Sequence, residues 1–197
     1  MMTGDGTTVL VAADDPHRVA ELRSWLVTEY RVEATTDGDD ALAVSADVDA
    51  VLIDRDLRTD AGTVVADEIE RRGLTQPMAP LHSADEPTGR RRPDDSLVAP
   101  VTKSAALEGV DRLLRRARYD ELLAECTALA AKRGALEADA AIVATEDRPE
   151  TLQRRLDELL AELDELVATF DGEDFRAAFE ACRVAGPGRS HRASDLP

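Results

Sequence analysis

Short apolar runs alternate with amphipathic stretches over about the first 105 residues, and this alternation constrains the fold more than any other feature. An apolar run bounded by Asp, Gly or Pro is typical of a buried strand, whereas apolar residues three and four apart are typical of a helix. The expected strands are residues 9–13, 30–34, 50–53, 78–81 and 97–99. The expected helices are 16–29, 39–46 and 62–72, followed by one that begins near Ser104.

Strands and helices in this order predict an α/β fold, a doubly wound parallel sheet of five strands with helices on both faces. Such sheets bind ligands outside the carboxyl ends of their strands. The residues expected there are Asp14, Asp15, Asp54, Ser83 and Ala99. Because carboxylate oxygens are the ligands that Mg²⁺ prefers, the acids among them indicate a cation site.

The apolar run that ends at Asp54, together with the acids after the first strand, resembles a known family. Residues 7–118 resemble the receiver domain of response regulators in two-component signalling, which has a flavodoxin-like fold. The resemblance implies that Asp54 accepts a phosphoryl group from a histidine kinase and that Ser83 is the switch hydroxyl that grips the phosphoryl oxygens. Phosphoryl transfer relies on neutralisation and in-line positioning, so a metal ion and nearby cations would do most of the work.

The same resemblance implies an Mg²⁺ site at this edge of the sheet. In our preferred alignment Asp14 is the principal metal acid, and Asp54 and the backbone carbonyl of Asp56 complete the protein ligands. An alignment shifted by one residue instead makes Asp14 and Asp15 the paired metal acids. Mg²⁺ is the cofactor that the sequence leads us to expect, and no other is indicated.

The family pattern is incomplete around this site. The lysine expected after the fifth strand is replaced by Ala99, and Lys103 lies on the expected next helix. Residues 84–95 carry little helical patterning, although the arginines at 90–92 could act as substitute cations. A phospho-switch with weakened Mg²⁺ binding and a phosphorylation-independent scaffold therefore both stay open, and the departures favour the scaffold.

Residues 104–185 have a different pattern, with apolar residues that repeat in steps of four and three. One helix is expected to run from the receiver-like part to about Ala144, weakened at Gly134 by about 1 kcal/mol relative to Ala. Pro149 marks a new helix start, and the leucines from Leu152 to Leu166 form a heptad seam that ends at Phe170. Two long helices joined by a short polar turn predict an antiparallel hairpin, closed within one chain or shared in a homodimer.

Residues 110–182 resemble the HalX domain, which follows receivers in salt-loving archaea. The best match is 119–123 together with Leu129, Ala130 and Lys132. The resemblance implies an output, dimerisation or partner-docking element. The expected organisation is an N-terminal tail at 1–6, a receiver-like domain at 7–118, a HalX-like hairpin at 119–185 and a disordered tail at 186–197.

The net charge of −17 limits the partners of this chain. Arginine supplies all but two of the 24 basic residues, and this acidic, lysine-poor composition is typical of proteins that work in concentrated salt. A DNA-binding transcriptional regulator is one alternative, based on the arginines between 112 and 118, but acidic residues flank them and no helix-turn-helix pattern follows. A histidine kinase or another signalling protein is the expected partner.

The chain is not expected to be an enzyme beyond accepting a phosphoryl group itself. The pair Asp54 and Asp56 is similar to the nucleophile loop of haloacid-dehalogenase phosphatases, but Arg58 stands where that family has Thr or Val. No apolar segment approaches the ~20 residues of a membrane span, and the first residues lack the pattern of a secretion signal, so we expect the cytoplasm. Cys126 and Cys182 form no metal or disulfide framework.

Overall fold

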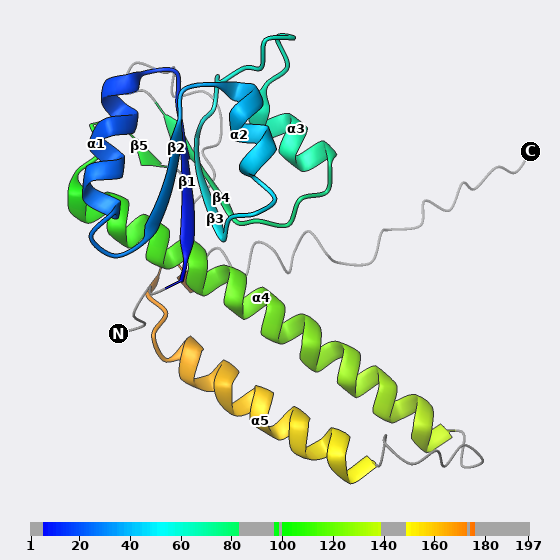
Figure 1. The fold of residues 1–197 in the computed structure, drawn as a ribbon. Helices are drawn as coiled ribbons and strands as arrows, with labels where there is room; N and C mark the ends of the chain where they lie inside the picture. The colour runs from blue at the N-terminus through cyan, green and yellow to red at the C-terminus, as the bar shows by residue number, and fades with distance from the viewer. Residues whose placement is uncertain (1–5, 83–96, 99, 139–148, 173, 176–197) are drawn as a thin grey trace, which may run out of the picture.

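The computed structural model describes residues 6–82, 97–98, 100–138, 149–172 and 174–175 (Figure 1). The strands are β1 (Thr8–Ala12), β2 (Arg31–Thr35), β3 (Ala50–Asp54), β4 (Met78–His82) and β5 (Leu97–Val98). The helices are α1 (Pro16–Leu26), α2 (Gly38–Val44), α3 (Val65–Arg71), α4 (Lys103–Ala138) and α5 (Pro149–Val167). No helix of this described part is long and apolar enough to cross a membrane.

The five strands form one sheet in the order β2-β1-β3-β4-β5, and every neighbouring pair is parallel. This confirms the predicted doubly wound α/β fold. In the register of β1 and β3, Ala12 lies beside Ile53, so the two central strands end at the same edge. The acids that follow them are therefore brought to one rim of the sheet.

Helices cover both faces of the sheet, as Figure 1 shows. Side chains alternate along β1, because successive residues of a strand point to opposite faces. Val9 and Val11 pack with α1 and α4, whereas Leu10 and Ala12 pack with α2 and α3. Central strands buried on both faces explain the near-continuous apolar runs in the sequence.

Helix α3 is shorter than the pattern predicts, since it begins at Val65 rather than Gly62. The preceding residues form a tight loop in which Thr59 N–H donates to the Thr63 carbonyl, and Gly62 has a φ of 82°. A positive φ is incompatible with a right-handed helix, which explains why the prediction was wrong here.

Helix α4 runs without interruption from the receiver-like part into the C-terminal hairpin, as predicted (Figure 1). Its first half buries Ala106, Val110 and Leu113 against the sheet. Its second half buries Leu122 and Cys126 against Leu159 of α5. The predicted extension of α4 to Ala144 and the predicted tail at 186–197 lie outside the described residues.

Candidate functional site

The candidate site lies where β1 and β3 end side by side. Asp54 is the last residue of β3, Asp14 follows β1 by two residues, and Asp56 lies in the loop after β3. Asp14 and Asp56 lie close enough to Asp54 for their negative charges to act on it, although burial is the largest cause of its raised pKa. Two of the other acids that the sequence places in the site are thus within electrostatic range of Asp54.

Both carboxylate oxygens of Asp54 already have a partner in the chain. Arg18 Nη1 lies 2.8 Å from Asp54 Oδ2, and the Asp56 N–H donates to Asp54 Oδ1 at 3.1 Å. The side chains of Arg18 and Asp54 are only 21% and 14% exposed, so this is a partly buried ion pair. Such a pair is screened less by salt than a pair on the open surface.

The pKa of Asp54 lies above its ordinary value despite these two donors. Burial is the largest cause, because it disfavours the charged form, and the nearby carboxylates of Asp14 and Asp56 act in the same direction. The Asp56 N–H and the Arg18 guanidinium oppose them. Arg18 therefore offsets only part of the cost of keeping a carboxylate at this position.

The other residues that the sequence predicts for the site do not contact Asp54 in the described structure or lie outside it. Asp15 is the N-cap of α1, where its Oδ1 accepts the His17 N–H at 2.9 Å. That role satisfies one of the free donors at the start of the helix. Ser83, Ala99 and the arginines at 90–92 lie outside the described residues. Lys103 is exposed at the start of α4.

The arrangement of the described residues does not fit Mg²⁺. Among them, no group of three or more His, Cys, Asp or Glu side chains is placed to hold a metal ion. Mg²⁺ needs oxygen ligands at about 2.1 Å, and an ion on Asp54 Oδ2 would lie close to the guanidinium that already contacts that oxygen. Unit positive charges about 4 Å apart near a protein surface repel by about 4 kcal/mol, and a divalent ion more.

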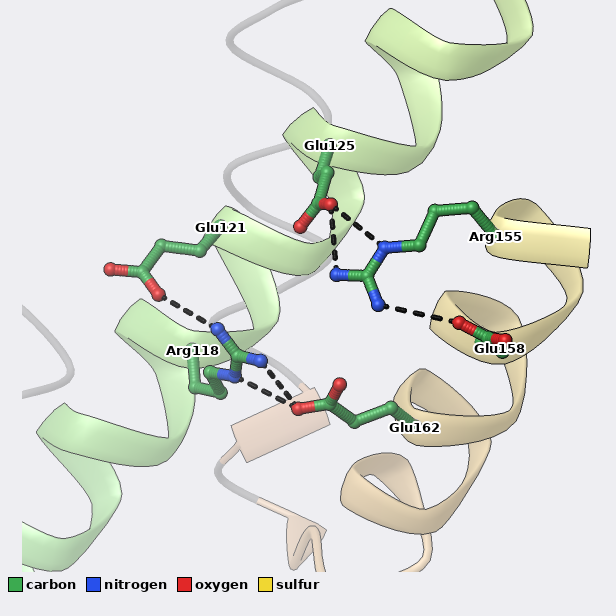
Figure 2. A network of polar contacts seen from close by, with 6 residues as sticks. All are labelled: Arg118, Glu121, Glu125, Arg155, Glu158 and Glu162. Carbon is green, nitrogen blue, oxygen red and sulfur yellow. Dashed lines mark hydrogen bonds and ion pairs between the residues drawn. The ribbon is translucent and has the colours of Figure 1, made fainter. Parts of the chain in front are cut away.

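The hairpin carries its own set of polar contacts, shown in Figure 2. Arg118 of α4 contacts Glu162 of α5 with its Nη2 at 2.5 Å, and Arg155 of α5 contacts Glu125 of α4 with its Nη2 at 3.1 Å. Because the earlier α4 residue meets the later α5 residue, the helices are antiparallel, as predicted. All four side chains are partly exposed, so each pair contributes little in water and less at high salt.

Helix α4 also makes partly buried contacts with Tyr30 and Asp174, which lie outside α5. The Tyr30 hydroxyl, just after α1, donates to Asp111 Oδ1, and burial together with Asp111 raises the pKa of Tyr30. Arg115 Nη2 lies 3.2 Å from Asp174 Oδ2, and the Asp174 side chain is 2% exposed. The segment after α5 is thereby held against α4 near the sheet.

The N-terminal part has the fold of solved receiver domains. NtrX from Brucella abortus matches with a TM-score of 0.52 and 18% identity, over 60% of this chain and 29% of that one. The "signal receiver domain of putative Luxo repressor protein" from Vibrio parahaemolyticus matches with a TM-score of 0.50 and 16% identity, over 59% and 96%. At these identities the likeness establishes the fold of response-regulator receivers.

The C-terminal part is a HalX domain, whose family matches residues 115–179. A "Putative transcriptional regulator" of Haloferax volcanii is 35% identical to this chain over 133 residues. That alignment covers 66% of this chain but only 23% of the relative's length. The chain therefore combines a receiver fold with a HalX domain, as the sequence led us to expect, and it has a relative in a halophilic archaeon.

Sequence reasoning missed Arg18, the residue in closest polar contact with Asp54. The arginines at 90–92 were the expected substitutes for the missing lysine at position 99, because they lie nearer to that position along the chain than Arg18 does. A usable signal was present, because Arg18 lies in the first turn of a helix that starts beside the acids of β1. A search for any cation on that first turn would have found it.

Proposed function

We propose that this protein is a two-component-type signal-transduction protein in which the receiver part takes the signal and the HalX hairpin delivers it. One observation carries this proposal: α4 belongs to both parts. Ala106, Val110 and Leu113 are in the core beside the sheet, and Leu122 and Cys126 are in the core of the hairpin. A change in how α4 packs on the sheet must therefore move the hairpin, because one rigid helix joins them.

Asp54 is the proposed phosphoacceptor. An oxygen of its carboxylate would attack the phosphorus of a phosphohistidine on a kinase partner, and the histidine imidazole would leave. The end position on β3, the neighbouring acids Asp14 and Asp56, and the receiver fold support this assignment. Ser83 is proposed to receive a phosphoryl oxygen as the switch hydroxyl. No step is assigned to Mg²⁺, because the described residues as arranged do not fit it.

The experiment is to incubate the protein with a small acyl phosphate in molar potassium chloride, with and without Mg²⁺, and to measure its intact mass. We expect a gain of one phosphoryl group that hydroxylamine removes, as an acyl phosphate requires. Asp54→Asn should abolish the gain, whereas Asp67→Asn, which changes an exposed acid of α3 outside the site, is a matched control that should still be labelled. Absence of labelling under every condition would overturn the phosphoacceptor role and leave the phosphorylation-independent scaffold.

The output surface is proposed to be the edge of the hairpin opposite the ion pairs in Figure 2. Leu123 lies five residues after Arg118 and two before Glu125, which places it about 140–160° around α4 from both. Leu160 has the same spacing from Arg155 and Glu162 on α5. These leucines are 40% and 44% exposed, so each helix of the hairpin presents one partly exposed leucine on the side away from the ion pairs.

Exposed apolar side chains that gather on one side of a molecule are typical of an interaction surface, so Leu123 and Leu160 are the residues to test. Sedimentation of the protein and of Leu123→Gln/Leu160→Gln in molar salt tests whether a second copy covers it. Loss of a dimer in the double variant, with Arg118→Gln/Arg155→Gln unaffected, would support a homodimer. If both double variants and the parent protein are monomers, a heterologous signalling partner remains.

Direct DNA binding is the weaker alternative. The name of the Haloferax volcanii relative brings it into consideration, but in this chain Arg115 and Arg118 pair with Asp174 and Glu162. Titration with random duplex DNA at several salt concentrations tests it. Binding that weakens steeply with salt would revive this function, because phosphate contacts release counterions.

A further inference from the structure

Arg18 occupies a place in the candidate site that neither the sequence pattern nor the comparisons assign. Its guanidinium lies 2.8 Å from Asp54 Oδ2, although 36 residues separate the two along the chain. The remaining oxygen, Oδ1, accepts the Asp56 N–H. A cation and a backbone donor thus hold the carboxylate from two sides.

The surrounding structure fixes the position from which Arg18 reaches Asp54. Helix α1 begins at Pro16, and the side chain of Asp15 caps its first turn. Val19, Leu22 and Leu26 anchor the other side of the helix in the core. The Arg18 side chain can change rotamer while the helix stays in place, so the ion pair can open without moving α1.

A guanidinium differs from the other cations that such a site could use. It stays charged at every physiological pH, and its planar donors suit both carboxylate and phosphoryl oxygens. The chain lacks the expected lysine, since Ala99 stands in its place. Arg18 therefore supplies a side-chain cation in contact with Asp54, the proposed phosphoacceptor.

We infer that Arg18 is the resident cation of this site and excludes divalent cations from Asp54 unless the Arg18–Asp54 ion pair opens. The negative charges of Asp14 and Asp56 act on Asp54 and favour a cation beside it, but the Arg18 guanidinium already contacts its Oδ2. The inference gives the site a built-in gate that depends on the rotamer of one side chain. Its significance for signalling rests on the proposed role of Asp54, whereas its test does not use phosphorylation.

The test measures the binding of Mn²⁺, used as a probe for Mg²⁺. Binding is monitored by electron paramagnetic resonance, in which the signal of free Mn²⁺ decreases as the ion binds. All proteins are kept in the same molar potassium chloride, which suppresses weak binding to the acidic surface. We compare the parent protein with Arg18→Gln, with Arg18→Gln/Asp54→Asn and with Arg23→Gln. Arg23 is an exposed arginine on the same helix, so its substitution makes the same change in net charge away from the site.

We expect Arg18→Gln to bind one Mn²⁺ at least tenfold more tightly than the parent protein. Arg23→Gln should behave like the parent, and adding Asp54→Asn should remove the gain. Equal affinity in the parent and Arg18→Gln would overturn the inference, as would a gain that persists without Asp54. Circular dichroism checks folding, and Arg18→Met, which keeps much of the apolar stem, provides the same test if Arg18→Gln does not fold.

This outcome is separable from the phosphorylation test. If acyl phosphate fails to label Asp54 but Arg18→Gln gains Mn²⁺ affinity, the proposed phosphoacceptor role fails and the resident-cation inference stands. If labelling succeeds while Arg18→Gln gains nothing, the inference fails and the proposed function stands.

Discussion

The receiver part and the hairpin are stabilised in different ways, although α4 runs through both. The receiver part buries aliphatic side chains on both faces of the sheet, in two separate clusters. In the hairpin the buried cluster consists of Leu122, Cys126 and Leu159, with other leucines only partly covered. Interhelical ion pairs flank this seam. One continuous helix can therefore be firmly anchored at one end and open more readily at the other.

This difference fits the proposed signalling role. An element that changes conformation is drawn from the less stable parts of a structure, since switching must be possible at low cost. The Tyr30–Asp111 hydrogen bond and the Arg115–Asp174 ion pair lie on the part of α4 between the receiver core and the hairpin core. The following substitutions test how separate the two regions are.

The largest effect is expected from Leu52→Ala in β3. Leu52 is fully buried in the cluster beneath α1 and α4, so the cavity should cost about 3–5 kcal/mol of unfolding free energy. Chemical denaturation at fixed molar salt measures it. Loss of protection throughout the receiver part in hydrogen exchange is expected, and a loss confined to β3 would contradict a single cooperative unit.

Leu159→Ala should act on the hairpin instead. Leu159 is also fully buried, but the cavity can collapse more easily between two helices, so about 2–3 kcal/mol is expected. Hydrogen exchange should speed up in α5 and the second half of α4 while the sheet keeps its protection. If the sheet loses protection equally, the two regions are not energetically distinct.

Two glycine-to-alanine substitutions are expected to change stability in opposite directions. A Cβ at Gly38 would lie 2.3 Å from the backbone oxygen of Arg58, so Gly38→Ala should destabilise the receiver part by about 1–3 kcal/mol. A Cβ at Gly134 meets nothing within 4 Å, so Gly134→Ala should stabilise α4 by about 1 kcal/mol. Thermal unfolding at one salt concentration compares them, and a destabilising Gly134→Ala would show that this part of α4 has unrecognised contacts.

Asp54→Asn should raise stability slightly, and only above the acid range. Burial raises the pKa of Asp54 in the folded state above its ordinary 3.8. The folded protein therefore loses stability as the pH rises from the ordinary pKa to the raised one. Asparagine removes this loss, while Arg18 can turn toward solvent. We expect a gain of less than about 1 kcal/mol at pH 7 that disappears below the ordinary pKa. Denaturation at several pH values measures it, and a pH-independent difference would contradict the assignment.

The smallest effect is expected from Arg155→Gln, which removes the ion pair with Glu125. Because both side chains are about half exposed, we expect only a small loss of unfolding free energy in dilute salt. In molar salt the Debye length is about 3 Å, so the loss should vanish there. A loss that persists in molar salt would show that the ionic edge contributes more to the hairpin than screening allows.

The sequence alone predicted the elements and the acids of the site, because these depend on local patterns. Buried runs such as Val51–Ile53 and the heptad leucines of α5 are visible in the chain itself, and Asp54 follows directly from the end of β3. The start of α3 was placed three residues too early, since the patterning of apolar residues does not report the positive φ of Gly62. The phosphoacceptor role and the domain limits stay predictions, and the described residues as arranged do not fit the expected Mg²⁺.

What only the tertiary structure decided are the partnerships between distant residues. Arg18 meets Asp54 across 36 residues and Arg115 meets Asp174 across 59, and no periodicity of either segment encodes those meetings. The physical reason is that strand and helix periods are set by a residue's near neighbours in the chain, whereas the partner of a charged side chain is set by how the finished sheet and helices pack. The apolar runs thus determined which layers form, and the packing of those layers determined which cation reached the central carboxylate.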